Sequence, residues 1–87
     1  MLFYNDKIYQ NEDKMLENDD QKGLKDFGLQ IKIKRISLGY SRNSLAKRSR
    51  LPLSCIGAIE RGDRNPSLLT IAKLGRALGQ TEFTVKF

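Results

Sequence analysis

The sequence has no histidine, no tryptophan and a single cysteine, Cys55, among its 87 residues. Without histidine, the common zinc-ligand sets and histidine-based acid–base catalysis are excluded. A lone cysteine cannot form a disulfide within the chain, which is typical of reducing compartments. No apolar run reaches the roughly 18 residues of a membrane span, and the N-terminus lacks the pattern of a signal peptide. The sequence therefore predicts a cytoplasmic protein.

No pattern in the sequence indicates an enzyme. A nucleophile–base pair, a glycine-rich phosphate loop and a cluster with metal-ligand spacing are all missing from it. Cys55 is expected to be a small packing residue rather than a reactive thiol, because it falls within a helical pattern. We expect neither catalysis nor a bound cofactor or metal ion.

Positive charge is in excess and is unevenly distributed. The formal net charge is +6. Residues 1–23 hold 3 lysines against 6 acids, a net charge of −3, whereas residues 24–87 hold 13 basic residues against 4 acids, a net charge of +9. A compact domain with this excess favours a polyanionic partner, through counterion release and electrostatic steering. A solvated basic surface would give the same composition, so charge alone leaves both interpretations open.

A first helix is expected from Leu24 to Gly39, which is placed to cap its C-terminus. Its inward face follows the 3–4 spacing of an amphipathic helix: Leu24, Phe27, Ile31 and Leu38. A second apolar stripe on the same helix needs a cover of its own: Leu29, Ile33 and Ile36. Either the polar N-terminal arm, residues 1–23, folds back over this stripe, or a second copy of the chain covers it.

Three further helices are expected, over about residues 42–49, 53–61 and 68–78. Ser41 and Ser67 are favourable N-caps, and Pro52 suits a helix start because its missing N–H would be unpaired there. Gly62 and Gly79 are placed to end the last two helices. The last helix is expected to turn four residues inward: Leu68, Ile71, Leu74 and Leu78. These elements predict an all-α domain of four to five helices over residues 24–80.

The tail, residues 81–87, alternates apolar and polar side chains, which predicts a short C-terminal β-strand. Its apolar members are Phe83, Val85 and Phe87. A lone strand cannot satisfy its backbone groups. It must therefore pair with the N-terminal arm or with the tail of a second copy, and in the second case these three residues form a dimerisation element.

Two short helices joined by a tight turn inside a compact helical domain follow the helix-turn-helix plan. Over residues 27–80 the sequence is similar to the Cro/CI-type (XRE) helix-turn-helix family. The similarity is carried by Phe27-Gly28, Ile31-Lys32, Arg35, Gly39-Tyr40-Ser41, Leu45-Ala46, Ile56, Ile59-Glu60-Arg61-Gly62, Asn65-Pro66-Ser67 and Ala77-Leu78-Gly79. The resemblance implies a lambda-repressor-like fold that binds double-stranded operator DNA, usually as a homodimer.

The resemblance also implies roles for individual residues. The reading positions, at the start of the third helix, would face base edges: Leu53, Ser54, Gly57 and Ala58. Basic residues around them would contact phosphates or add positive field: Arg42, Lys47, Arg48, Arg50, Arg61 and Arg64. Arg35 and Glu60 would form a structural ion pair.

The sequence departs from the family pattern at the turn and at the reading positions. Arg50 replaces the usual turn glycine, so a positive φ is expected there. The reading positions offer one hydroxyl, that of Ser54, and otherwise only apolar contact. Gly57 is also unfavourable inside a helix. Specificity could thus come from DNA shape or from a partner, and a protein-interaction module with little specific DNA contact is the alternative function.

The function that the sequence predicts is a DNA-binding transcriptional repressor. A helix-turn-helix followed by a strand-like tail resembles HipB-type antitoxins, in which the tails of two subunits pair into one sheet. That resemblance adds an antitoxin role, with a toxin as protein partner. A phage-type repressor without a toxin is the remaining alternative.

Overall fold

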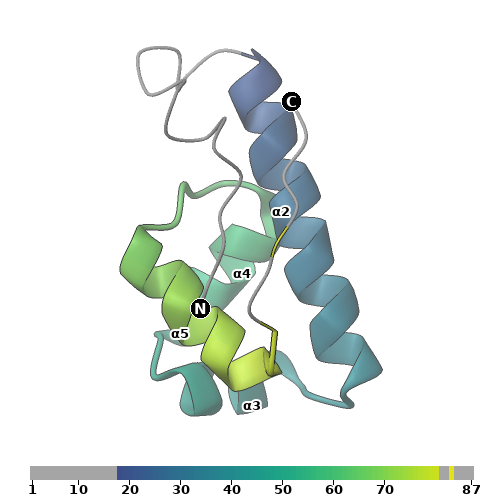
Figure 1. The fold of residues 1–87 in the computed structure, drawn as a ribbon, viewed down its shortest axis with the longest axis vertical. Helices are drawn as coiled ribbons and strands as arrows, with labels where there is room; N and C mark the ends of the chain where they lie inside the picture. The colour runs from purple at the N-terminus through teal and green to yellow at the C-terminus, as the bar shows by residue number, and fades with distance from the viewer. Residues whose placement is uncertain (1–17, 81–82, 84–87) are drawn as a thin grey trace.

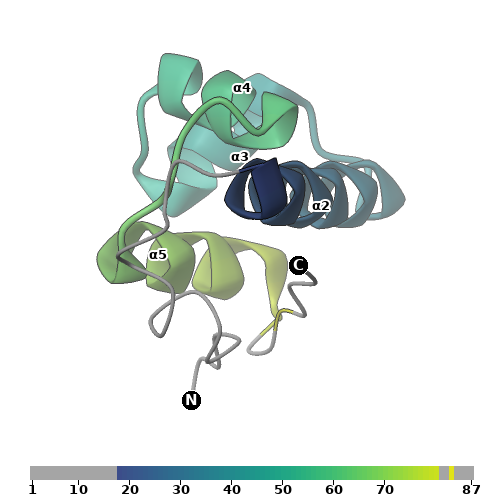
Figure 2. The ribbon, with the colours of Figure 1, turned by 90° about the horizontal axis from the view of Figure 1, so that it is seen from above.

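The computed structural model describes residues 18–80 and Phe83. Within these residues it contains helices and no strand: α2 (Asn18–Ser37), α3 (Arg42–Ser49), α4 (Leu53–Arg61) and α5 (Leu68–Leu78). Helix α2 is the long element in Figure 1, and the three short helices pack along one side of it. Figure 2 shows α4 and α5 on opposite sides of the molecule, with α3 and α2 between them. The predicted all-α, four-helix domain is confirmed.

Helix α2 begins at Asn18, ahead of the expected start at Leu24. The last part of the predicted arm, residues 18–23, is therefore helical. Residues 1–17 lie outside the described residues.

The short helices begin and end where the local sequence predicts. The Ser41 hydroxyl accepts a hydrogen bond from the backbone N–H of Ser44 at 3.0 Å, and the Ser67 hydroxyl accepts one from that of Thr70 at 3.1 Å. Gly62 follows α4 with a φ of 76°, in the left-handed region that glycine adopts without a steric penalty. The starts of α3 and α5 are thus set by side-chain caps, and the end of α4 is set by a left-handed glycine.

The core lies where the four helices meet. Its largest fully buried side chains are Phe27, Ile31, Leu45, Ile56, Ile59, Ile71 and Leu74. Cys55 is also buried, as expected for a packing residue. Phe83 packs edge-to-face on Phe27, with ring centroids 5.2 Å apart and an interplanar angle of 68°. The tail therefore contributes one aromatic ring to the core of its own chain.

The C-terminal strand prediction falls almost entirely outside the described residues. Of its three apolar residues, only Phe83 is described, and it is not in a strand. Its burial inside the chain means that its side chain is already used for packing. Val85 and Phe87 lie outside the described residues.

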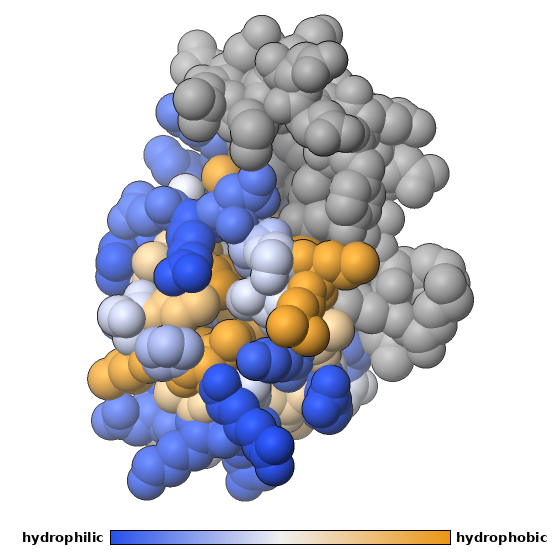
Figure 3. Space-filling model, turned by 90° about the vertical axis from the view of Figure 1, so that its left-hand side faces the viewer, coloured by the Kyte–Doolittle hydropathy of each residue, from blue (hydrophilic) through white to orange (hydrophobic). Residues whose placement is uncertain are grey.

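Two leucines that the spacing predicts as inward are exposed. Leu38 is 40% exposed because it follows the last residue of α2, where the helical spacing no longer applies. Leu68 is 55% exposed because it begins α5, before the helix reaches its neighbours. Figure 3 shows apolar residues among hydrophilic ones on the face that contains α5. The second stripe of α2 (Leu29, Ile33 and Ile36) is exposed within the described part of the chain.

Helix α4 crosses α2 at a distance that only glycine permits. A Cβ added to Gly28 would collide with the carbonyl oxygen of Ile59. Just beyond the same end of α4, a Cβ added to Gly62 would lie 2.6 Å from Cγ of Lys25. Both glycines fix the position of α4 against the long helix. None of the helices in the described ranges is both long and apolar enough to cross a lipid bilayer.

Candidate nucleic-acid interface

Helices α3 and α4 form a helix-turn-helix joined by a turn at Arg50 and Leu51. Arg50 adopts a φ of 60° and is the sole described non-glycine residue with a positive φ. The backbone N–H of Leu51 donates to the carbonyl of Ala46 at 3.1 Å, which closes the turn. Pro52 then starts α4 with a φ of −60°. The positive φ expected at Arg50 is confirmed.

A buried carboxylate ties this unit to α2. Glu60 Oε2 accepts from Nε of Arg35 at 2.6 Å, and its Oε1 accepts from Nη2 of the same arginine at 3.2 Å. Nη1 of Arg35 donates to the carbonyl of Tyr40 at 2.9 Å. The side chains of Arg35 and Glu60 are only 10% and 1% exposed. The two residues paired from the sequence are in direct contact, and the pair is buried rather than superficial.

Arg42 joins the same carboxylate, a contact that the sequence reasoning missed. Its Nε donates to Glu60 Oε1 at 3.1 Å, while its side chain stays 45% exposed. The three residues Arg35, Glu60 and Arg42 sum to a formal charge of +1. The exposed guanidinium of Arg42 is thus held at the start of α3. The group of three residues to which it belongs remains net positive. The sequence separation of 18 residues gives no local signal for this contact.

The reading positions lie at the start of α4, with unequal access. Leu53 is 47% exposed and Ser54 is exposed, whereas Ala58 is half-buried and Gly57 is buried. The cover over Gly57 comes from the same helix, because Nη1 of Arg61 lies 3.1 Å from the position that a Cβ of residue 57 would take. Gly57 itself therefore offers little surface to a base.

The basic residues named from the sequence surround the helix-turn-helix and are all exposed: Arg42, Lys47, Arg48, Arg50, Arg61 and Arg64. Nε of Arg61 pairs with Asp63 Oδ2 at 2.9 Å. The guanidinium carbon of Arg48 lies 4.3 Å from the ring centroid of Tyr40, in a cation–π contact. Positive charge is therefore grouped on α3, on α4 and in the segments next to them, where a phosphate backbone could be met.

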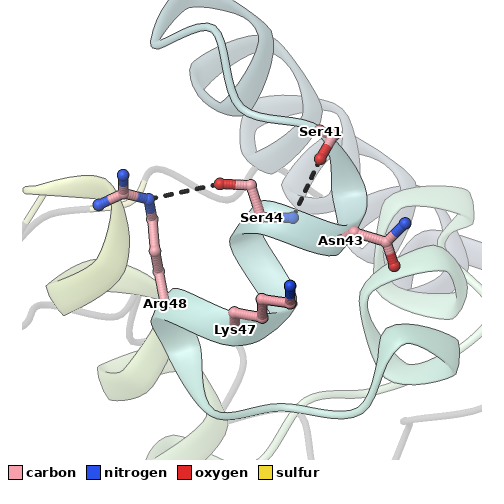
Figure 4. Close-up of a pocket in the computed structure, with 5 residues that line it drawn as sticks. All are labelled: Ser41, Asn43, Ser44, Lys47 and Arg48. Carbon is pink, nitrogen blue, oxygen red and sulfur yellow. Dashed lines mark hydrogen bonds between the residues drawn. The ribbon is translucent and has the colours of Figure 1, made fainter.

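A polar hollow lies beside α3. It is lined by Ser41, Asn43, Ser44, Lys47 and Arg48. In Figure 4, Arg48 extends toward the Ser44 hydroxyl, with Nε 3.4 Å from it, while Asn43 projects from the other side of the helix. Hydroxyl, amide and ammonium groups in one hollow are suited to an oxyanion such as a DNA phosphate. The hollow thus extends the basic surface rather than forming a separate site.

The sequence and the fold were compared with those of known proteins. The profile of the helix-turn-helix family matches residues 31–85. The restriction-modification controller protein C.AhdI from Aeromonas hydrophila has a similar structure, with a TM-score of 0.64 and 42% identity, over 66% of this chain and 86% of that one. No curated protein matches the sequence.

Two further structures show what similar proteins bind. The controller protein C.Esp1396I was solved as a tetramer with its natural 35 base-pair operator, with a TM-score of 0.63 and 28% identity, over 66% of this chain and 75% of that one. The complex of SinR and SinI proteins has a TM-score of 0.61 and 32% identity, over 63% of this chain and 54% of that one. The profile match, the folded helix-turn-helix and these structures agree that the chain belongs to the Cro/CI-type (XRE) helix-turn-helix family.

Proposed function

We propose that this protein is a transcriptional regulator that binds operator DNA in a sequence-specific manner, with the start of α4 in a major groove. The observation that carries the proposal is the surface around α4. The reading positions Leu53 and Ser54 are exposed, and exposed arginines lie on both sides of them in the helix-turn-helix, Arg42 at the start of α3 and Arg64 in the loop after α4. This arrangement gives a groove-reading element flanked by phosphate-binding groups.

The contacts that seat α4 on its neighbours support the same function. A reading helix must keep its position when phosphates are bound, and here Gly28 seats the helix directly on α2. Glu60, near the end of α4, binds arginines from α2 and α3. The C-terminal part of the reading helix is therefore held by contacts with both α2 and α3, which favours a fixed orientation of the helix.

We propose a homodimer as the DNA-binding form. The α4 helix has nine residues and can contact only a few base pairs. Two copies related by a two-fold axis would read two half-sites about 34 Å apart, which provides the footprint for specific binding. The operator complex of the similar C.Esp1396I is a tetramer, which supports an oligomeric regulator that binds at an operator.

The antitoxin role stays a prediction, as does a toxin partner. The similar structures are controllers of restriction-modification systems and the SinR–SinI complex. They support a regulator of the controller type over an antitoxin. The SinR–SinI complex shows a similar protein with a protein partner, so a second protein that binds this chain is compatible with the proposal.

Binding of the purified protein to random-sequence duplexes, measured against salt, tests the proposal. A dimer with Arg42 and Arg64 of both copies on phosphates makes at least four contacts, so affinity should fall about a hundredfold or more between about 50 and 200 mM salt. Selection from the same random library should then enrich a two-fold symmetric sequence. Weak binding with a flat salt response would reject the proposal and favour a protein-interaction module, which the apolar side chains of Leu53 and Ala58 would suit.

A further inference from the structure

We propose that Arg61 is the residue of α4 that reads a base, a guanine in the major groove, and that Gly57 and Asp63 direct it there. The inference rests on the proposed function and adds the reading residue to it. The sequence reasoning gave Arg61 to the phosphate backbone, and the structure points to a different use.

The side chain of Arg61 turns back along α4 toward the reading positions. Its Nε donates to Asp63 Oδ2 at 2.9 Å, and its Nη1 lies 3.1 Å from where a Cβ on Gly57 would be. Residues 57 and 61 are four apart and share a helix face. Arg61 therefore occupies the surface that residue 57 would otherwise present, and it remains 57% exposed there.

The position of the Arg61 side chain explains why residue 57 is a glycine. Glycine is the least favourable residue in a helix interior apart from proline, so Gly57 needs a compensating reason. A side chain at residue 57 would crowd the Arg61 guanidinium. The other reading positions provide one hydroxyl, that of Ser54, and no strong donor pair. Arg61 thus supplies the hydrogen-bond donors that the start of α4 lacks.

Arg61 and Arg42 differ in the net charge of the groups around them, and this difference makes Arg42 the better phosphate ligand. Arg42 shares Glu60 with Arg35, and that group keeps a net charge of +1. Arg61 and Asp63 are both exposed and sum to zero, and the Asp63 carboxylate would repel a phosphate brought close to the pair. A neutral pair is therefore a weak phosphate ligand.

The free donors of Arg61 match guanine. Among the described residues, only Asp63 accepts a hydrogen bond from this side chain, through Nε. The two terminal nitrogens keep their N–H groups side by side. Guanine presents N7 and O6 as neighbouring acceptors in the major groove, and a guanidinium binds both at once. Because Nε is already bound to Asp63, part of the freedom of the side chain is lost before a base binds.

Parallel selections from one random duplex library test the proposal, with the wild type, Arg61→Lys, Asp63→Asn and, as a matched control, Arg76→Lys on α5. The wild type should enrich guanine at one position of each half-site. Lysine keeps the charge but cannot form the bidentate contact, so Arg61→Lys should lose that preference by about tenfold or more. Its other selected positions and its salt dependence should match the wild type, as should every property of Arg76→Lys.

Asp63→Asn gives a second, independent readout. It removes the pairing charge, so affinity for unselected duplex should rise while the preference for guanine falls. A wild type that selects no guanine, or an Arg61→Lys variant that selects the wild-type sequence with the same preference, would overturn the proposal and return Arg61 to the phosphates. A wild type that retains no duplex at low salt would reject the proposed function itself, which is a separate outcome.

Discussion

Nε of Arg42 lies 3.1 Å from Oε1 of Glu60, so an exposed arginine at the start of α3 is bound to a carboxylate buried on α4. Arg35 reaches the same carboxylate from α2. Three helices therefore meet at one side chain. The contact serves stability, since it satisfies a buried charge, and it serves DNA binding, since it fixes the direction of an exposed guanidinium.

Arg42→Ala should weaken DNA binding by a similar factor on all sequences. The reason is that a phosphate contact carries no base information. The slope of log affinity against log salt should become shallower by about one per lost contact. Filter binding or anisotropy on selected and random duplexes over a salt series measures both. Arg76→Ala, an equal loss of charge on α5, is the control and should change the slope less. A change of base preference in Arg42→Ala would contradict the phosphate assignment.

Glu60→Ala should lower the free energy of unfolding by about 3–5 kcal/mol, because it leaves the buried Arg35 without a counter-charge. Urea denaturation followed by circular dichroism measures the loss. The double variant Arg35→Met with Glu60→Leu removes both charges and keeps apolar volume, so it should lose less than Glu60→Ala alone. A double variant as unstable as Glu60→Ala would show that the buried charge is not the cause.

Two glycine-to-alanine changes in helices should have opposite effects. Gly28→Ala places a methyl group against the Ile59 carbonyl, a backbone atom that cannot move aside, and should cost about 1–3 kcal/mol or more. Gly57→Ala meets only the flexible end of Arg61 and should gain up to about 1 kcal/mol from helix propensity. Thermal denaturation compares the two. Equal melting temperatures would contradict the close crossing of α2 and α4.

Arg50→Gly should raise stability by about 1 kcal/mol, because a φ of 60° strains any residue that has a Cβ. The control is Lys47→Gly, an exposed position inside α3, which should lose about 1 kcal/mol. Chemical denaturation of both variants provides the values. If Arg50→Gly were as destabilised as the control, the contacts of the Arg50 side chain would have to stabilise the fold by more than the strain of its positive φ destabilises it.

Much of the candidate site can be predicted from the sequence, because it depends on local rules. The caps at Ser41 and Ser67 and the bounds of α3 and α4 follow from hydrogen bonds and φ preferences within a few residues, whereas the left-handed Arg50 was expected from the turn glycine of the family that the sequence resembles. Helix α2 begins earlier than the sequence predicts, because the residues before Leu24 are polar and give no apolar periodicity. Leu38 and Leu68 show that spacing loses its meaning at helix ends.

The sequence by itself determined the helix-turn-helix and the charge around it, since periodicity and capping act along the chain. The tertiary structure alone decided that Arg42 shares Glu60, that Phe83 enters the core and that Arg61 lies over Gly57. The first two of these join residues that are far apart in sequence, and the third depends on which way a long side chain turns. Such contacts depend on how helices are seated and on which neighbours compete for each charged group, and no local pattern encodes either.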